Sequence, residues 1–160
     1  LEIVQQHMSK LNVITPDTEN VRCLAQLVEY RRKLVQDRVD VTNKITTTLK
    51  NYYPHVLDWF KEKDSMILCD FLLRWPSLEQ VKRARKQTLI DFFNQHNSRY
   101  PAVNEKRLCD IKQAEILTND KAITSPNLLL VECLVAQLKQ LILSIERFDH
   151  DIKSIYKTVN

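Results

Sequence analysis

The chain has 160 residues, of which 44% are hydrophobic and 28% are charged, with a formal net charge of +4. This balance excludes an intrinsically disordered chain and fits one ordinary domain with a buried core. The sequence contains no glycine, although average usage predicts about ten. The glycine-rich phosphate loops of P-loop and dinucleotide-binding folds are therefore excluded, and long helices joined by polar or proline-marked turns are expected.

Residues 1–16 are expected to form a linker or the tail of a preceding domain, ending at Pro16. Asp17 or Thr18 is a suitable N-cap for the helix that follows. Apolar residues then recur mostly three or four positions apart, so the segment 17–53 predicts a first long helix of a coiled coil. The residues expected at its interface are Val21, Leu24, Val28, Val35, Ile45 and Leu49.

Arg31 and Arg38 lie one heptad apart and close to this apolar stripe. Their aliphatic stems can run along the seam while the guanidinium groups reach water. Alternatively, the two arginines contact nucleic acid or another subunit. The residues leave both interpretations open, and both arginines are candidate nucleic-acid-binding residues.

The segment 54–125 is less periodic and predicts a small bundle of short helices. Ser77 and Gln80 fit a capping box at the start of one of them. The helices are expected near residues 55–61, 65–74, 77–84, 88–96 and 103–116.

The segment 126–160 predicts the second long helix, with Ser125 as N-cap and Pro126 at the first helical position. It carries four sustained heptads, a strong coiled-coil signal. The expected fold is therefore all-α, with a long antiparallel coiled-coil helix pair and a small helical bundle inserted between the two long helices. The interface residues expected on the second helix are Val131, Leu134, Leu138, Leu141, Ile145, Phe148, Ile152 and Ile155, followed by Val159.

No catalytic or metal-binding constellation is predicted within the chain. A metal-dependent nuclease needs two or three converging carboxylates, but the aspartates at 70, 91, 110, 149 and 151 are scattered or point apart, and structural or solvent roles are expected. The four histidines are scattered, and no serine lies on a glycine elbow. Cys23, Cys69, Cys109 and Cys133 lack zinc spacing, so buried free thiols are expected.

The basic run Lys82, Arg83, Arg85 and Lys86 is the best candidate for a functional surface. Clustered positive charge binds phosphates, but a charged run is equally consistent with a solvated face. Aromatic residues of the same region either stack on bases or fill the core, and the second interpretation is favoured. These aromatics are Tyr52, Tyr53, Trp59, Trp75 and Tyr100.

Three segments, residues 27–60, 69–101 and 125–152, resemble the middle region of the insertion-sequence one-hundred-ten (IS110) family of transposases, with its Piv-like DNA invertase relatives. The resemblance covers nearly the whole chain in order. It implies a parent protein with an N-terminal RuvC-like domain that binds divalent metal, with magnesium expected, through a DEDD carboxylate set. It also implies a C-terminal domain with a serine nucleophile, and recombination guided by a bridge RNA. No catalytic position of the family falls within this chain.

Two functional hypotheses follow. The first is an assembly module of a DNA transposase or recombinase, self-associating through the coiled coil as a dimer or higher oligomer. The second is a nucleic-acid-binding module centred on Lys82–Lys86, which contacts DNA and guide RNA. A stand-alone enzyme is the third and least supported. The chain starts at Leu1 and lacks a signal peptide or a run of about 18 apolar residues. A cytoplasmic segment of a longer protein is therefore expected, with no membrane and no cofactor of its own.

Overall fold

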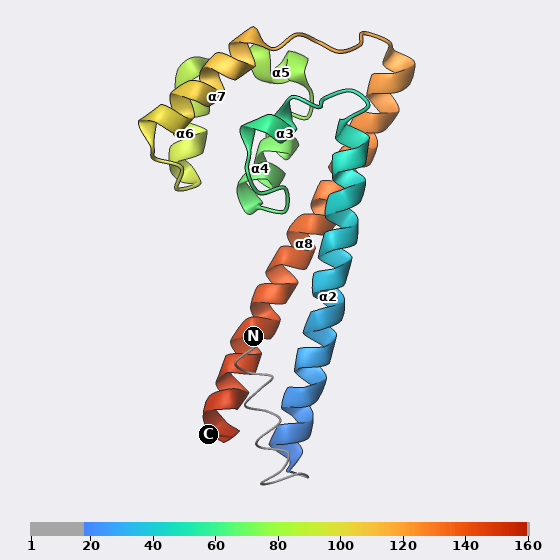
Figure 1. Ribbon diagram of the computed structural model, residues 1–160, viewed down its shortest axis with the longest axis vertical. Coiled ribbons are helices and arrows are strands. Elements are labelled where there is room, and N and C mark those ends of the chain that lie inside the picture. The colour runs from blue at the N-terminus through green and yellow to red at the C-terminus, as the bar shows by residue number, and fades with distance from the viewer. Residues whose placement is uncertain (1–17, 160) are drawn as a thin grey trace. The chain divides into compact units, whose positions relative to one another are not determined.

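The computed structural model describes residues 18–159 of the chain (Figure 1). Every regular element in this range is an α-helix, which confirms the predicted all-α fold class. The described residues form two compact units. The first unit combines residues 18–39 with residues 140–159, and the second contains residues 40–139.

Two long helices, α2 (Glu19–Leu49) and α8 (Lys121–Val159), contribute to both units and pack together with opposite chain directions (Figure 1). In the first unit, Leu24 and Val28 of α2 form a buried cluster with Ile152 of α8. In the second unit, the Asn51 side chain just after α2 donates a hydrogen bond of 3.0 Å to the Asn127 side chain. The predicted antiparallel pair is therefore confirmed, and its two helices belong to one chain.

The start of α2 agrees with the sequence, since the Thr18 hydroxyl accepts a hydrogen bond of 3.2 Å from the Val21 backbone N–H. The start of α8 does not agree with it. This helix begins at Lys121, and Pro126 lies inside it. Asp120 acts as the cap, because its carboxylate accepts a 3.0 Å hydrogen bond from the Ala122 N–H. The prediction that Ser125 caps the helix at Pro126 is therefore wrong: an aspartate upstream starts the helix first.

The apolar stripe of α8 is wider than the predicted heptad seam. Val131, Leu138, Ile145 and Ile152, all at the first heptad position, are buried. Among the residues predicted at the fourth position, Leu134 is buried, whereas Leu141, Phe148 and Ile155 are half-buried. Val135 and Ile142 are buried but were not predicted. A straight helix drifts by about 20° per heptad relative to a 3.5-residue repeat, so the buried stripe follows 3.6-residue spacing instead.

The α2 stripe shows the same pattern. The predicted residues Val21, Leu24, Val28, Ile45 and Leu49 are buried, and Val41 joins them. Val35 is only half-buried. The helix ends at Leu49, four residues before the predicted end of the segment at position 53, and Tyr52 and Tyr53 follow it in a turn.

Five short helices lie between α2 and α8 in sequence, all within the second unit. Ser65 caps α4, and Ser77 caps α5 by accepting a hydrogen bond from the Gln80 N–H, as its capping-box spacing predicts. The five helices are α3 (Val56–Trp59), α4 (Met66–Arg74), α5 (Leu78–Lys82), α6 (Lys86–Gln95) and α7 (Pro101–Gln113).

An aromatic cluster forms the core of this inserted region. Phe71 on α4 is fully buried at its centre, with its ring 5.0 Å from Phe60, 5.1 Å from Trp75 and 5.7 Å from Phe92. Four of the five aromatics considered for base stacking, Tyr52, Tyr53, Trp59 and Trp75, are buried. Only Tyr100 is exposed, at 75%. The core interpretation therefore holds for the first four residues.

Asn97 provides the left-handed residue that ends α6 in a chain without glycine. Its φ is 62°. The Ser98 N–H donates to the Phe93 carbonyl at 2.8 Å, and the Asn97 N–H donates to the Asn94 carbonyl at 3.2 Å. This pair of bonds is a Schellman motif, and asparagine is the residue that tolerates this conformation best after glycine.

Three of the four cysteines are exposed, contrary to expectation. Only Cys69 is buried, so the prediction that all four cysteines are buried is wrong: Cys23, Cys109 and Cys133 lie on outward helix positions.

Helix α8 contains an 18-residue stretch that is apolar enough for a membrane span and is about one-third buried. By length and composition alone α8 could cross a membrane, but core helices of soluble proteins can have the same length and composition.

Candidate nucleic-acid interface

The predicted basic run lies at the corner between α5 and α6. Lys82 is the last residue of α5, Arg83 follows as its C-cap, and Arg85 precedes Lys86, the first residue of α6. All four side chains are exposed. The structure therefore brings the four predicted residues onto one corner of the second unit, because a single tight connection joins the two helices.

These four cations are not equivalent. The Lys82 ammonium donates hydrogen bonds to the carbonyls of Lys112 and Ala114, where it caps the C-terminal end of α7. Arg83 forms an exposed ion pair with Glu79 at 2.6 Å. Lys86 lies 3.8 Å from Glu105 in another exposed pair. Lys82 thus has a structural role, while exposed pairs of this kind contribute at most about 1 kcal/mol.

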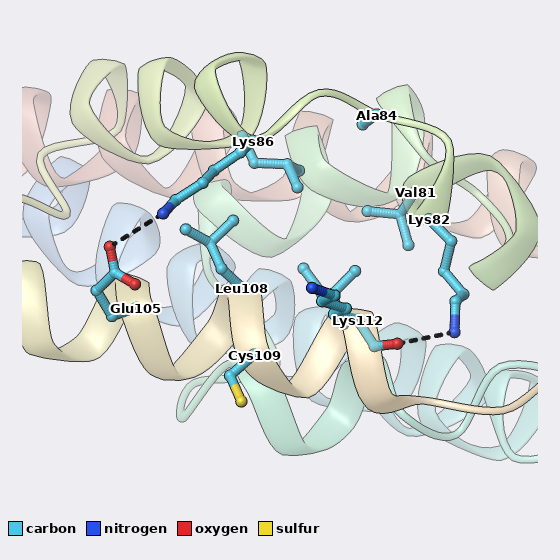
Figure 2. A pocket seen from close by; sticks show the side chains of 10 residues that line it. Val81, Lys82, Ala84, Lys86, Glu105, Leu108, Cys109 and Lys112 are labelled. Carbon is cyan, nitrogen blue, oxygen red and sulfur yellow. Dashed lines mark hydrogen bonds and ion pairs between the residues drawn. The ribbon is translucent and has the colours of Figure 1, made fainter.

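A pocket opens directly beside this corner, between α5, α6 and α7 (Figure 2). Its volume is about 520 Å³, within the usual range of about 300–1,000 Å³ for small-ligand sites. We call it the α5–α7 pocket. Its lining residues are Val81, Lys82, Ala84, Lys86, Leu89, Glu105, Leu108, Cys109, Ile111 and Lys112.

The two arginines proposed on α2 have different surroundings. Arg31 forms an ion pair with Asp149 of α8 within the first unit, and a second contact joins Nη2 to Oδ2 at 3.5 Å. Both side chains are partly buried, at 21% and 33% exposure. Arg31 therefore links the two long helices of one chain, a partner that helix periodicity alone could not reveal. Arg38 is half-buried on α2.

The aspartates do not assemble a metal centre. Asp149 pairs with Arg31, and Asp91 accepts a hydrogen bond from Gln87. Among residues 18–159, no group of three or more His, Cys, Asp or Glu side chains could hold a metal ion. The family resemblance places its divalent metal in a separate N-terminal domain and not among these residues.

Asp70 is the centre of a polar cluster that sequence analysis missed. Its carboxylate accepts hydrogen bonds from Lys139 of α8 at 2.7 Å and from the Nε2 side of His96 at 2.8 Å. The other ring nitrogen of His96 lies 2.9 Å from the Phe92 carbonyl. Partial burial raises the pKa of Asp70, but the hydrogen bonds from Lys139 and His96 outweigh it, so this pKa is lowered overall. The cluster ties α4, α6 and α8 together.

Arg107 on α7 is a second polar residue with a structural role. Its guanidinium lies over the rings of Phe60 and Phe93, at 4.7 and 5.2 Å from their centroids. It also donates to the Trp59 carbonyl at 2.8 Å and to the Ser98 hydroxyl at 2.8 Å. Burial lowers the pKa of Arg107. This cation therefore closes the aromatic cluster and is not part of the exposed basic corner.

Comparison with known families gives one match. Residues 2–54 match a family model described as a transposase, that of the DEDD transposases of IS110 insertion sequences. The matched range includes all of α2 and covers about a third of the chain. A search of curated proteins and a search of solved structures each found no match. The match supports a transposase-related role and agrees with the family that residues 27–60 resemble.

Proposed function

We propose that this chain is the central helical segment of an IS110-type DNA transposase, where it serves subunit assembly and contacts DNA or RNA. The family match at residues 2–54 is the observation that supports the transposase assignment most directly. The absence of a catalytic constellation among the described residues is compatible with a supporting role. Catalysis would then depend on other parts of the parent protein.

The assembly role is supported by the face of α8 that α2 leaves uncovered. In the second unit, Leu129 and Leu130 remain 61% and 48% exposed, beside exposed Cys133 and Ala136. We call these four residues the α8 outer face. An apolar partner that covers exposed leucines removes their surface from water, and this burial stabilises the complex. None of these four side chains is charged, whereas Lys44 of α2 lines the groove beside Leu130. The four residues themselves therefore do not repel an identical set on a second copy of the chain.

This interpretation changes the predicted dimer interface. The heptad residues expected to join subunits are mostly buried between α2 and α8 of one chain, so self-association would use the α8 outer face instead. Two copies would cover the same leucines across a two-fold axis, because such an interface uses one patch on both subunits.

Sedimentation equilibrium tests the assembly role. We expect the wild-type chain to form a dimer at micromolar concentrations, and the double variant Leu129→Glu, Leu130→Glu to be monomeric with an unchanged helix content. The control is Leu117→Glu, because Leu117 is similarly exposed but lies before α8. A wild-type chain that stays monomeric, or a double variant that still dimerises, would contradict this proposal.

The nucleic-acid role rests on the basic corner. Arg83, Arg85 and Lys86 are exposed, whereas Lys82 holds α7 and should be left intact in a test. We expect wild-type binding of labelled nucleic acid to weaken steeply with salt. The triple variant R83Q, R85Q, K86Q should bind much more weakly, while the control K50Q, K61Q, K153Q removes the same charge from other exposed positions. Equal binding by both triple variants would rule out the corner as the contact site.

A further inference from the structure

The α5–α7 pocket has a floor that is apolar and already well packed. Val81, Leu89 and Ile111 are buried beneath it, and Leu108 is half-buried at its wall. Figure 2 shows Leu108 extending from α7 into the space below α5 and α6. A ligand group that fills this pocket must therefore present an apolar face, because the floor offers it little to hydrogen-bond.

The rim of the pocket is basic. The ammonium groups of Lys86 and Lys112 flank the apolar wall, and Glu105 is the only acidic residue in the lining. The ion pair between Lys86 and Glu105 is long and exposed, with side-chain exposures of 69% and 63%. No ion pair involves the Lys112 ammonium within residues 18–159. Both lysines can therefore turn to an anionic group at the pocket mouth at little cost.

A nucleotide combines the two properties that this pocket selects, since a nucleobase has two flat faces of low polarity and its phosphate is anionic. A base inside a duplex is stacked between its neighbours and cannot enter, whereas an unpaired base can be turned outward. We propose that the α5–α7 pocket holds one unpaired nucleotide of a single-stranded nucleic acid, with its base against Leu108 and its phosphate between Lys86 and Lys112. This inference rests on the proposed nucleic-acid contact and makes it specific for unpaired strands.

The basic corner continues this site outward. Arg83 and Arg85 are exposed on the same α5–α6 connection, next to the pocket lining at Lys82, Ala84 and Lys86. The phosphates that flank the bound nucleotide would lie along these arginines, because a strand carries one charge at each nucleotide. The corner alone would bind duplex and single strands alike, and the pocket supplies the preference between them.

Fluorescence anisotropy with the full chain tests this proposal. The probes are labelled oligomers of about twelve nucleotides, within the usual site size for single-strand-binding modules: single-stranded DNA, single-stranded RNA and a DNA duplex of the same sequence. We expect both single strands to bind at least about fivefold more tightly than the duplex, since a base that leaves water to lie against Leu108 adds apolar burial that a stacked duplex base cannot add. The ratio between DNA and RNA identifies which strand the pocket prefers.

Two substitutions separate the pocket from the corner. Lys112→Gln should weaken single-strand binding about three- to tenfold and reduce the salt slope by about one, whereas Lys106→Gln, on the same helix but outside the α5–α7 pocket, should not. Leu108→Gln should replace the apolar wall of the pocket by a polar side chain, abolish the preference for single strands and leave duplex binding by the corner unchanged. A circular dichroism melt of each variant ensures that only folded proteins are compared.

Thiol labelling gives an independent measurement. Cys109 is exposed at the edge of the pocket, and Cys23 is an exposed cysteine on α2 in the first unit. A bound single strand should slow alkylation of Cys109 but not of Cys23. An acidic helical peptide serves as the competing ligand, because a lysine-rimmed apolar groove also fits such a segment. If the peptide protects Cys109 and the oligonucleotides do not, the pocket is a protein-binding site and the inference is overturned.

The outcomes distinguish this inference from the proposed function. If no nucleic acid binds at all, the proposed nucleic-acid contact fails, and the pocket assignment fails with it. If single strands and duplex bind equally, and Lys112→Gln and Leu108→Gln bind like the wild type, only the pocket assignment fails. Losses of the same size for duplex and single strands in Lys112→Gln would reduce Lys112 to a surface phosphate contact and would also overturn it.

Discussion

The two compact units of this chain are built on different kinds of core. In the first unit, α2 and α8 bury an aliphatic stripe to which each helix contributes regularly spaced residues such as Val21, Leu24 and Ile152. In the second unit, the short helices surround an aromatic cluster centred on Phe71, whose rings come from irregularly spaced positions. The aliphatic stripe repeats the same kind of contact at each helical turn. The aromatic cluster has no such repeat, because its rings all pack around Phe71.

The largest effect is expected from Phe71→Ala, which removes the ring at the centre of the cluster. Deletion of a buried phenylalanine side chain destabilises a protein by about 3–5 kcal/mol, because it loses apolar burial and leaves a cavity. Urea unfolding followed by tryptophan fluorescence measures the loss, since both tryptophans of the chain belong to the second unit. Tyr100→Ala, at an exposed aromatic, is the control. A loss below about 1 kcal/mol would mean that the cluster is not a continuous core.

A smaller effect is expected from Leu24→Ala in the aliphatic stripe. Leu24 is fully buried, so we expect a loss of about 2–4 kcal/mol. Because both tryptophans lie in the other unit, far-UV circular dichroism should move to lower urea more than the fluorescence does. Cys23→Ala, at the adjacent exposed position, should change neither signal. Equal shifts of the two signals would show that the stripe and the cluster unfold as one core.

Asp70→Asn tests the polar cluster that fixes α4 to α6 and α8. We expect a loss of about 1–2 kcal/mol at pH 7, because the hydrogen bonds from His96 and Lys139 are weakened. The lowered pKa of Asp70 gives the sign of the pH effect. Its stabilising contribution is complete above the unfolded value of about 3.9 and is lost as the pH falls through the lower pKa of the folded state.

The stability difference between wild type and Asp70→Asn should therefore shrink on acidification, as measured by urea unfolding across that range. Asp91→Asn, at an exposed aspartate that only accepts a hydrogen bond from Gln87, is the matched control and should show no such difference. A constant difference between pH 7 and pH 3 would contradict the role of the ionised carboxylate.

The smallest expected effect on stability comes from substituting two adjacent tyrosines, Tyr52 and Tyr53. The Tyr52 hydroxyl donates a hydrogen bond of 2.8 Å to the Pro76 carbonyl, whereas the buried Tyr53 hydroxyl has no hydrogen-bond partner among the described residues. Burial raises the pKa of both residues above its usual value. Tyr52→Phe should cost about 1 kcal/mol, because it leaves the Pro76 carbonyl unsatisfied. Tyr53→Phe should be neutral or stabilising by a similar amount, and thermal melts compare the pair directly.

The sequence predicted the features that depend on local spacing. Apolar residues three and four positions apart identified α2 and α8, and the capping-box spacing of Ser77 and Gln80 identified the cap of α5. The basic run was also visible, because it is contiguous. The position of Lys82 shows the limit of such evidence: its neighbours in sequence indicate a phosphate site, while its ammonium in fact caps α7, thirty residues further along the chain.

By itself, then, the sequence determined that the chain is helical, which faces of its two long helices are apolar, and which family it resembles. The tertiary structure decided that these stripes are covered within one chain, that Arg31 meets Asp149, and that α7 closes a pocket beside the basic corner. The physical reason is the sequence separation between the residues that form each feature. Helix periodicity and capping are set by residues within about four positions, whereas ion pairs, ring clusters and pockets join residues that only the folded chain brings together.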